Sequence, residues 1–384
     1  MADVPLSGHT TSVLRRLTHL TTLQTVRSGG AMTLAHIARA SGLSRPTVAS
    51  QLEELAEQGW VEEQPAESSG GRPARRYRFR AQAGYAVGAD IGAHTVRIGV
   101  ADLAGDVVVT RRARVAETAS AADRLAVARE TLTAALDEAQ VARSQVLAAA
   151  VGTVGVVDSA GRVTLSVLPQ WSGVDLAGRL SRSLPCPLLV ENDANLAALA
   201  EHWLGASREA DNVVHVLAGR RNGAGLIIDG RLFRGRSGAA GEIGALDLLG
   251  WDEAPGELAQ AAGAEADPET AVELVFAAAR AGDATAREAV ERFAVRLAQG
   301  IAAMVLTVDP DLIVVGGGVS LAREALIGPL TEQVGKLCLS TPALRISELG
   351  EEAVMMGAIK LALADVDRRL LGLDAGLGQF SATS

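Results

Sequence analysis

The segment VENDAN, residues 190–195, places Asn192 and Asp193 where a predicted buried strand is followed by a predicted helix. In α/β proteins the carboxyl ends of the strands open onto the ligand cleft, so polar side chains at such a junction are well placed for chemistry. Asp193 therefore has three interpretations: a catalytic base, a ligand clamp, or an Asp that only starts a helix. The third role is common, because Asp and Asn are ordinary N-caps.

A second group of candidate residues lies near the amino terminus, where residues 34–57 have the spacing of a helix-turn-helix. A helix is predicted over 34–40, a turn over 41–43, and then a second helix in which Val48, Leu52 and Leu55 share one face. The second helix of such a motif enters the DNA major groove. Its predicted cap and its exposed DNA-contacting positions are Ser44, Arg45, Thr47, Ser50 and Gln51.

The segment after this motif is typical of the wing of a winged helix. A strand is predicted to begin at Trp60, and a Gly-rich stretch is followed by alternating Arg and aromatic residues, with five Arg among residues 72–80. Arg72, Arg75 and Arg76 are predicted to reach phosphates or a narrow minor groove. A small helical bundle followed by a solvated linker, with no role in DNA binding, is the alternative.

Composition and charge bound the class of protein. The chain has 384 residues, enough for two or three domains, and a net charge of −9, which argues against coating nucleic acid along its whole length. Residues 1–80 have a net charge of +3 and the remaining residues a net charge of −12, so a basic module precedes an acidic body. Cys186 and Cys338 are predicted to be free thiols. With no apolar run of roughly 18 residues and no signal pattern, the expected location is cytoplasmic, without membrane contact.

The elements that must position these residues form a repeated pattern. From Tyr85 onward, three strands precede alternating helices and strands, and the same order returns after residue 212. Two similar lobes with a cleft between them are therefore expected. The predicted division assigns 1–80 to the DNA-binding domain, with its wing and linker at 62–82. It assigns 83–195 and a helix at about 353–370 to the first lobe, and 196–352 to the second.

The order winged helix, DIG, VGTVGVVD, ENDAN, GAAGEIG and IVVGGG resembles the ROK family of sugar-responsive repressors and sugar kinases. The resemblance implies an α/β, actin-like (ribonuclease H-like), two-lobed fold behind a winged helix-turn-helix. It also implies that Asp193 matches the kinases' general base and that Asn192 and Glu242 hold sugar hydroxyls. Gly155 and, offset by one position, Glu257 are further implied ligand contacts. In LPQWSG, Trp171 has an aromatic face that suits a sugar ring, although packing between elements is an equal alternative.

The sequence departs from the kinase members of that family at both phosphate loops. The kinases' Asp-Ile-Gly-Gly-Thr-Lys is Asp90-Ile91-Gly92-Ala93-His94-Thr95 here, and Arg220-Arg221-Asn222 follows Gly219 in the second loop. Long side chains are expected to spoil a backbone phosphate cradle, although Arg can itself bind phosphate. The Gly316–Gly318 turn persists. The family's zinc ligands are absent, with Ala245 at the His position and no Cys cluster, so no metal and no cofactor are expected.

These observations together predict a DNA-binding transcriptional regulator, a repressor of carbohydrate genes, and not an enzyme. Its partners would be a double-stranded DNA operator, a monosaccharide or derivative such as an amino sugar or sugar phosphate, and a second copy of the chain in a dimer or tetramer. Ligand in the cleft would change the dimer geometry and hence operator affinity. Two alternatives stay open: an active ATP-dependent sugar kinase, and a regulator controlled by a protein partner with a vestigial sugar site.

Overall fold

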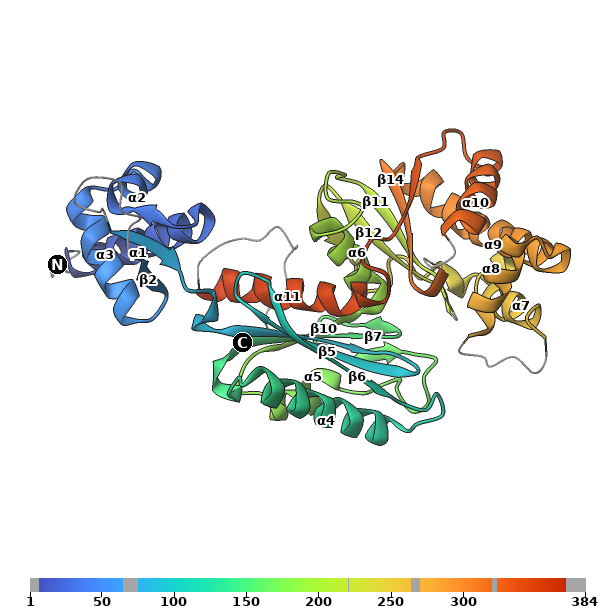
Figure 1. The fold of residues 1–384 in the computed structure, drawn as a ribbon, viewed down its shortest axis with the longest axis horizontal. Coiled ribbons are helices and arrows are strands. Elements are labelled where there is room, and N and C mark those ends of the chain that lie inside the picture. Colours follow the sequence, from blue (N-terminus) through green and yellow to red (C-terminus); the bar gives the residue numbers. More distant parts are fainter. Residues whose placement is uncertain (1–6, 65–74, 220, 264–269, 320–322, 371–384) are drawn as a thin grey trace, which may run out of the picture.

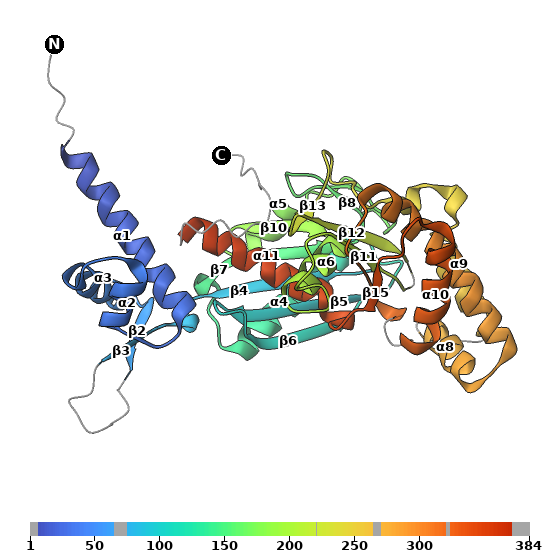
Figure 2. The same cartoon turned by 90° about the horizontal axis from the view of Figure 1, so that it is seen from above.

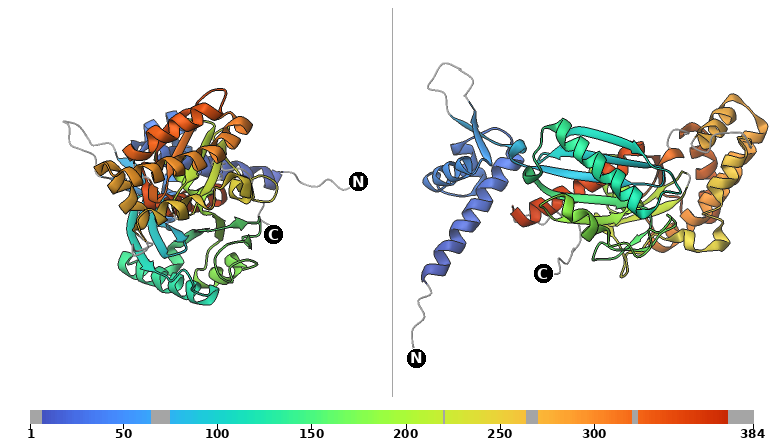
Figure 3. Two further views of the ribbon diagram at one scale, coloured as in Figure 1. Left: turned by 90° about the vertical axis from the view of Figure 1, so that its right-hand side faces the viewer. Right: turned by 90° about the horizontal axis from the view of Figure 1, so that it is seen from below.

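Two five-stranded sheets with the same strand order form the body of the chain, and a small helix-turn-helix domain precedes them (Figure 1). The computed structural model describes residues 7–64, 75–219, 221–263, 270–319 and 323–370. The two ends of the long axis carry the helix-turn-helix domain and helices α7–α10, as Figure 3 shows from below. None of the helices among the described residues is long and apolar enough to cross a membrane.

The amino-terminal domain is a three-helix unit with a short three-stranded sheet of order β1-β3-β2. Its elements are α1 (Ser7–Gly29), β1 (Met32–Thr33), α2 (Leu34–Ser41), α3 (Arg45–Glu57), β2 (Val61–Gln64) and β3 (Arg76–Phe79). Strands β2 and β3 pair antiparallel and form the two sides of the wing. The turn between α2 and α3 begins at Gly42, which has φ 71°, the left-handed value that a helix C-cap favours. The predicted winged helix-turn-helix is therefore confirmed.

The first lobe has the sheet order β10-β7-β4-β5-β6. Its strands are β4 (Tyr85–Ile91), β5 (Thr95–Asp102), β6 (Val107–Arg114), β7 (Val146–Thr153) and β10 (Leu188–Asn192), with a small hairpin of β8 (Val156–Val157) and β9 (Val163–Leu165); its helices are α4 (Ala121–Ala139) and α5 (Leu176–Leu180). The central strand β4 is almost entirely buried, as a strand covered on both faces must be. The edge strand β6 is mostly exposed and rich in Arg, which blunts an open sheet edge.

The second lobe repeats this topology, with the order β13-β12-β11-β14-β15. Its elements are β11 (Val213–Leu217), β12 (Gly223–Ile228), β13 (Arg231–Phe233), α7 (Ala254–Gln260), α8 (Ala271–Ala281), α9 (Ala284–Val308), β14 (Leu312–Gly316), α10 (Arg323–Leu337) and β15 (Ala343–Ile346). In both lobes the first strand pairs antiparallel with the second and parallel with the fourth. The duplicated, two-lobed α/β fold expected from the sequence is confirmed.

Helices α6 (Asp193–Trp203) and α11 (Ala353–Leu370) pack against each other between the two sheets. In Figure 1, α11 runs along one face of the first sheet, and α4 and α5 lie on the opposite face. Helix α6 is buried along nearly its whole length because it also contacts β11 and β12 of the second lobe. The lobe boundary that we expected at 195/196 falls inside this helix, so α6 is the element shared by both lobes.

The core of the helix-turn-helix domain is continuous with that of the first lobe. One apolar cluster joins Leu23 and Val26 of α1 to Leu103 in the β5–β6 turn and to Leu363 and Val366 of α11. Figure 2 shows the end of α1 beside this part of the body, while the rest of the helix points away from it. The amino-terminal domain is therefore packed onto the same helix, α11, that lies against α6.

Candidate functional site

A cavity of about 450 Å³ lies between the loops of the two lobes. The first lobe contributes Asp90, the loop Gly92–Thr95 and Asp193, and the second lobe contributes Gly219 and the Gly317–Gly318 turn. Its volume is within the range of about 300–1,000 Å³ that is typical of small-molecule sites. The cavity is therefore the candidate ligand site of the body.

Asn192 and Asp193 of VENDAN have different roles: Asn192 caps a helix, and Asp193 faces the cavity. Asn192 is the N-cap of α6, because its Oδ1 accepts a hydrogen bond from the backbone N–H of Asn195 at 3.0 Å. Its Nδ2 donates to the carbonyl of Gly155 at 3.1 Å. Asp193 is the first residue of the helix and faces the cavity. The two predicted ligand contacts thus separate: Asp193 lines the cavity, whereas buried Asn192 caps the helix.

Gly155 supports this arrangement from the neighbouring loop. It has φ 118°, and a Cβ there would lie 2.2 Å from the carbonyl oxygen of Leu165, so no other residue fits without a shift. Its carbonyl accepts the Asn192 amide. Gly155 was predicted as a ligand contact; the structure gives it a contact with the side chain that caps α6, and Val154 beside it lines the cavity.

The carboxyl groups of the cavity have raised pKa values. Burial raises the pKa of Asp193, and with the nearby charges of Asp90 and Glu242 the pKa reaches about 7. Burial also raises the pKa of Asp90 to about 6, although Arg97, 3.4 Å away, opposes the shift. A carboxyl group with a pKa near neutrality can both donate and accept hydrogen bonds at pH 7. This suits a hydroxyl-rich ligand.

The two remaining acidic residues that were predicted to contact sugar, Glu242 and Glu257, lie in different surroundings. Glu242 is at an exposed position, yet near enough for its charge to raise the pKa of Asp193. Partial burial, and the charge of Asp252, raise the pKa of Glu242 itself. Glu257, in α7, does not line the cavity: it forms an ion pair of 3.4 Å with Arg296 of α9. The structure thus places Glu257, a predicted ligand contact, outside the lining of this cavity.

Trp171 is a core residue, so the predicted aromatic face for a sugar ring is also wrong. Its side chain is 0% exposed, and its indole Nε1 donates to the hydroxyl of Thr153 at 2.8 Å. The guanidinium of buried Arg124 lies 5.9 Å from the ring centroid. Gln170, which precedes Trp171, has φ 56°, a left-handed backbone conformation that is uncommon for a residue other than Gly.

The helix-turn-helix surface agrees with the prediction at most positions. Ser44 caps α3, accepting from the N–H of Thr47 at 3.3 Å, and Arg45 and Ser50 are exposed near the helix start. The prediction that Gln51 is an exposed DNA-contacting position is wrong. Gln51 is only 5% exposed, and its Oε1 contacts Nδ1 of His19 in α1 at 3.0 Å. Gln51 lies on the same face as the core positions of α3, because positions three and four residues apart share a face.

In the wing, Arg76 is exposed at the start of β3. Arg75 forms an exposed ion pair of 3.1 Å with Glu63, and Arg78 forms one of 2.5 Å with Glu62. Exposed pairs of this kind are weak, so these Arg residues can exchange a carboxylate for a phosphate at little cost. The predicted contact Arg72 lies outside the described residues.

Comparison with known proteins identifies the family. The sequence profile of the ROK family matches residues 86–256 and 256–365.

The chain belongs to the ROK family.

The profile of the IclR helix-turn-helix domain matches residues 12–65, so the chain joins such a domain to a ROK body. It is 23% identical to the xylose repressor of Caldicellulosiruptor bescii, a match that spans 94% of this chain and 98% of that protein. It is 28% identical to the glucokinase of Halalkalibacterium halodurans over 71% of this chain and 92% of that protein.

Solved structures of ROK proteins share the fold. A ROK family transcriptional regulator, a homolog of the E. coli MLC protein, superposes with a TM-score of 0.69 at 21% identity, covering 92% of this chain and 97% of the other. The ROK glucokinase of Streptomyces griseus, in complex with glucose and AMPPNP, has a TM-score of 0.61 at 27% identity, covering 73% of this chain and 99% of the other. The match to the regulator extends beyond the share that the kinase covers.

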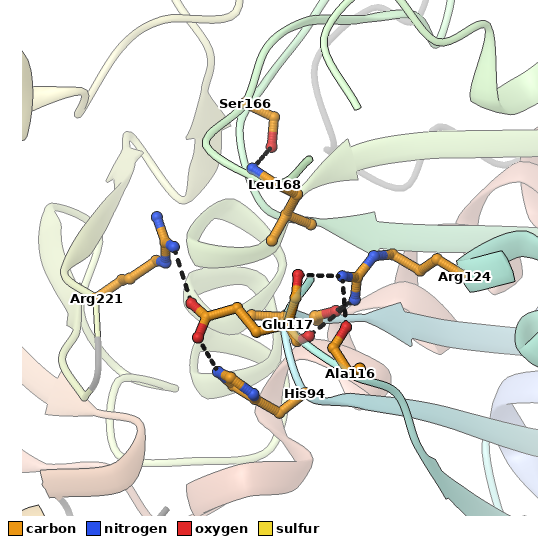
Figure 4. Close-up of polar contacts among 9 residues, drawn as sticks. His94, Ala116, Glu117, Arg124, Ser166, Leu168 and Arg221 are labelled. Atoms are coloured by element: carbon orange, nitrogen blue, oxygen red, sulfur yellow. Dashed lines mark hydrogen bonds and ion pairs between the residues drawn. The ribbon is translucent and has the colours of Figure 1, made fainter. Parts of the chain in front are cut away.

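The loops that depart from the kinase pattern of the ROK family meet across the cavity. His94 from the first loop and Arg221 from the second approach one carboxylate, Glu117 (Figure 4). Asn222 instead donates to the carbonyl of buried Trp251 at 2.7 Å and so fixes the second loop to its own lobe. Arg220 lies outside the described residues. Within the described part of the chain, no group of three or more His, Cys, Asp or Glu is arranged to hold a metal ion.

The sequence interpretation missed several charged residues of the cavity wall. Arg97 of β5 and Arg112 and Arg114 of β6 line the cavity, as does Glu351 before α11. The alternation of side chains along a strand would have placed Arg112 and Arg114 on one face. The sequence did not show that this face lies beside the cavity, because that depends on how β6 pairs with β5 at the edge of the sheet.

Proposed function

We propose that this ROK protein is a sugar-responsive, DNA-binding transcriptional repressor. The observation that carries the proposal is the continuous packing from cavity to DNA-binding domain. Asp193, which faces the cavity, begins α6; α6 packs along α11; and α11 shares a core with α1. A ligand that shifts α6 thus acts on the element that holds the helix-turn-helix domain. The full-length match to a protein named xylose repressor supports the same function.

A polar joint supports the packing between α1 and α11. Arg27, at the end of α1, forms an ion pair with Asp367 of α11 and donates to the carbonyl of Leu103 at 3.0 Å. Its guanidinium also lies 5.5 Å from the ring centroid of Phe79 in β3. Because Arg27 contacts α11, the β5–β6 turn and the wing, a rotation of α11 would change the orientation of the DNA-binding domain.

Ligand and operator binding would then be linked. In a dimer, the angle between the two lobes sets the separation of the two recognition helices, which must match half-sites about 34 Å or its multiples apart. Sugar in the cavity would favour one angle and operator DNA the other. The coupling free energy between two such sites is typically about 1–3 kcal/mol. Sugar and operator DNA would each reduce the binding affinity of the other by the same factor.

Calorimetry followed by DNA binding tests the proposal. The protein is titrated with xylose, glucose and N-acetylglucosamine, and the titration is repeated with Asp193→Ala. We expect that one sugar binds the wild type with micromolar affinity and does not bind the variant. The same sugar should change the affinity of the protein for a DNA site selected from random sequence. Failure of every sugar and sugar derivative to alter DNA binding would contradict the proposal and favour control by a protein partner.

A sugar kinase is the second candidate, and Asp193 is the observation that favours it. A carboxyl group with a pKa of about 7 that faces the cavity has the pKa and the position that a general base needs. Phosphoryl transfer also needs a cradle for the phosphates, and here Arg221 and His94 replace residues of that cradle. Sugar-dependent ADP release that is abolished in Asp193→Asn would establish the kinase; ATP turnover at the background rate would exclude it.

A further inference from the structure

A fully buried carboxylate, on Glu201 in the last turn of α6, lies outside the lining of the ligand cavity. Its Oε2 accepts a hydrogen bond from the backbone N–H of Ala206 at 2.7 Å. Its Oε1 accepts from the hydroxyl of Ser347 at 2.5 Å and from the N–H of Leu349 at 3.1 Å. A buried charge is tolerated only when hydrogen bonds replace its hydration. Ser347 and Leu349 therefore tie residues 347–349 to the end of α6.

Residues 347–352, which we call the connector, join β15 of the second lobe to α11. Gly350 and Glu351 of the connector line the ligand cavity, and Glu351 forms an ion pair with Arg97 of the first lobe. Helix α11 then shares a core with α1. The connector is thus the segment through which the cavity wall continues into the helix that packs against the DNA-binding domain.

A buried histidine lies near the carboxylate that holds the connector. His215 belongs to β11, which packs against α6 (Figure 1). It is 0% exposed, and no residue that the structure describes forms a hydrogen bond with either of its ring nitrogens. Burial lowers the pKa of His215, and against the opposing charge of Glu201 the pKa reaches about 4. The imidazole is therefore neutral at pH 7, with one N–H donor and one acceptor nitrogen.

Gly316, at the end of β14, lies between His215 and the connector. A Cβ built at Gly316 would lie 3.1 Å from Nε2 of His215 and 3.3 Å from Oγ of Ser347. The imidazole and the hydroxyl therefore approach the same glycine, and the hydroxyl already donates to Glu201. Because Gly316 has no side chain, it leaves the space between the imidazole and this hydrogen bond open. A buried N–H gains a hydrogen bond in any arrangement that brings it to an acceptor.

We propose that His215 and the connector compete for Oε1 of Glu201, so that the hinge between the second lobe and α11 has two discrete positions. In the position that this structure shows, Ser347 and Leu349 donate to Oε1, and the connector is tied to α6. In the other position the ring N–H of neutral His215 donates to Oε1, and the connector is released. Two hydrogen-bond sets that exclude each other give a two-state element, and elements of this kind amplify small shifts at a ligand site.

The effect of this switch on DNA rests on the proposed function. A sugar in the cavity would contact the wall to which Gly350 and Glu351 belong, and each position of the connector gives α11 one orientation. A ligand shifts a two-state equilibrium only by its different affinity for the two states. Removing one of the competing donors shifts the same equilibrium without any ligand. Loss of His215 and loss of the Ser347 hydroxyl should therefore act in opposite directions.

Hydrogen–deuterium exchange of the full-length protein tests the switch without sugar or DNA. Exchange is resolved at the amide of Leu349, with the amide of Ala206 as the internal reference, because Ala206 donates to the other oxygen of Glu201. The variants are His215→Leu and Ser347→Ala. The matched control is Ser207→Ala, which removes a buried hydroxyl that has no hydrogen-bond partner among the described residues. Chemical denaturation of each variant separates local opening from global unfolding.

His215→Leu is the decisive variant, because it deletes the competing donor and keeps an apolar side chain in the core. We expect exchange at Leu349 to become about 10-fold slower, the effect of one hydrogen bond to a charged group. Ser347→Ala should make it about 10-fold faster, and Ser207→Ala should leave it unchanged. Faster exchange in both His215→Leu and Ser347→Ala is what a merely structural cluster would give, and it would overturn the switch. Unchanged exchange in His215→Leu would also overturn it.

Operator affinity of the same variants tests the link to function, with a DNA site selected by the wild-type protein. We expect His215→Leu and Ser347→Ala to shift this affinity in opposite directions, so that the two variants differ by about 5-fold or more. Opposite effects on exchange with equal operator affinities would keep the switch and overturn its role in the proposed function. Absence of DNA binding by the wild type would overturn the proposed function alone, because the exchange measurement does not depend on it.

Discussion

Replacing Asp193 by Asn should stabilise the protein, and only at neutral and alkaline pH. Burial, together with the charges of Asp90 and Glu242, raises the pKa of Asp193 from 3.8 to about 7. The folded state therefore holds this proton more tightly than the unfolded state does. The stabilisation from the protonated carboxyl is fully present below about pH 4 and is lost as the pH rises through about 7.

The magnitude follows from the same pKa values. A rise of about 3 in pKa corresponds to about 4 kcal/mol of lost stability once the group is ionised, an upper limit because the site is open to the cavity. Asn keeps the acceptor that receives the N–H of Ala194 at 2.9 Å and carries no charge. We therefore expect Asp193→Asn to exceed the wild type by about 2–4 kcal/mol above pH 7.5, and to match it near pH 4.

Chemical denaturation of both proteins between pH 4 and pH 8.5 measures this difference. Asp90→Asn serves as a matched variant: it removes one of the charges that raise the pKa of Asp193, so the advantage of Asp193→Asn should shrink in that background. A difference between wild type and variant that does not change with pH would refute the reasoning. So would a loss of stability in Asp193→Asn that grows with pH, because the carboxylate would then be the form that the fold favours.

Four further substitutions have expected outcomes. Gly357→Ala places a Cβ 1.9 Å from the carbonyl oxygen of Leu196, where α11 crosses α6, and should cost about 1–3 kcal/mol or more, seen as a lower melting temperature. Arg45→Ala should relax the choice among operator sequences, whereas Arg76→Ala should weaken all DNA about equally and reduce the salt slope by about one; the reverse pattern would contradict the groove assignment. Arg27→Met should leave ligand-free operator affinity nearly unchanged but reduce the effect of ligand on it by about 5-fold or more, measured by fluorescence anisotropy.

Local patterns in the sequence predicted most elements of the fold. The face formed by Val48, Leu52 and Leu55, the Ser44 cap and the alternating strands after Tyr85 all depend on neighbours close in sequence. The predicted repeat of two lobes was confirmed by the identical strand orders of the two sheets. The errors concern side-chain direction. Gln51 was expected to be exposed, and packing of α1 against α3 buries it.

The candidate site was only partly predictable for the same reason. Asp193 could be found from sequence, because a strand-to-helix junction is a local feature and such a junction opens onto the ligand cleft in α/β proteins. The raised pKa of that residue could not be predicted, since it comes first from burial and then from the charges of Asp90 and Glu242, which are distant in sequence. Glu117 carried no signal in the sequence, because its importance comes from Arg221, 104 residues away on the other lobe.

The sequence by itself determined the order of domains, the duplicated α/β pattern and the identity of the residues at the strand ends. Periodicity, caps and turns act over a few residues, so the chain alone specifies them. Tertiary structure alone decided that Trp171 enters the core and that Glu117 joins His94 to Arg221. It also decided that α11 links the cavity helix to the DNA-binding domain. Burial and charge act through space, so which groups they bring together is fixed only when the two sheets and the helices between them have packed.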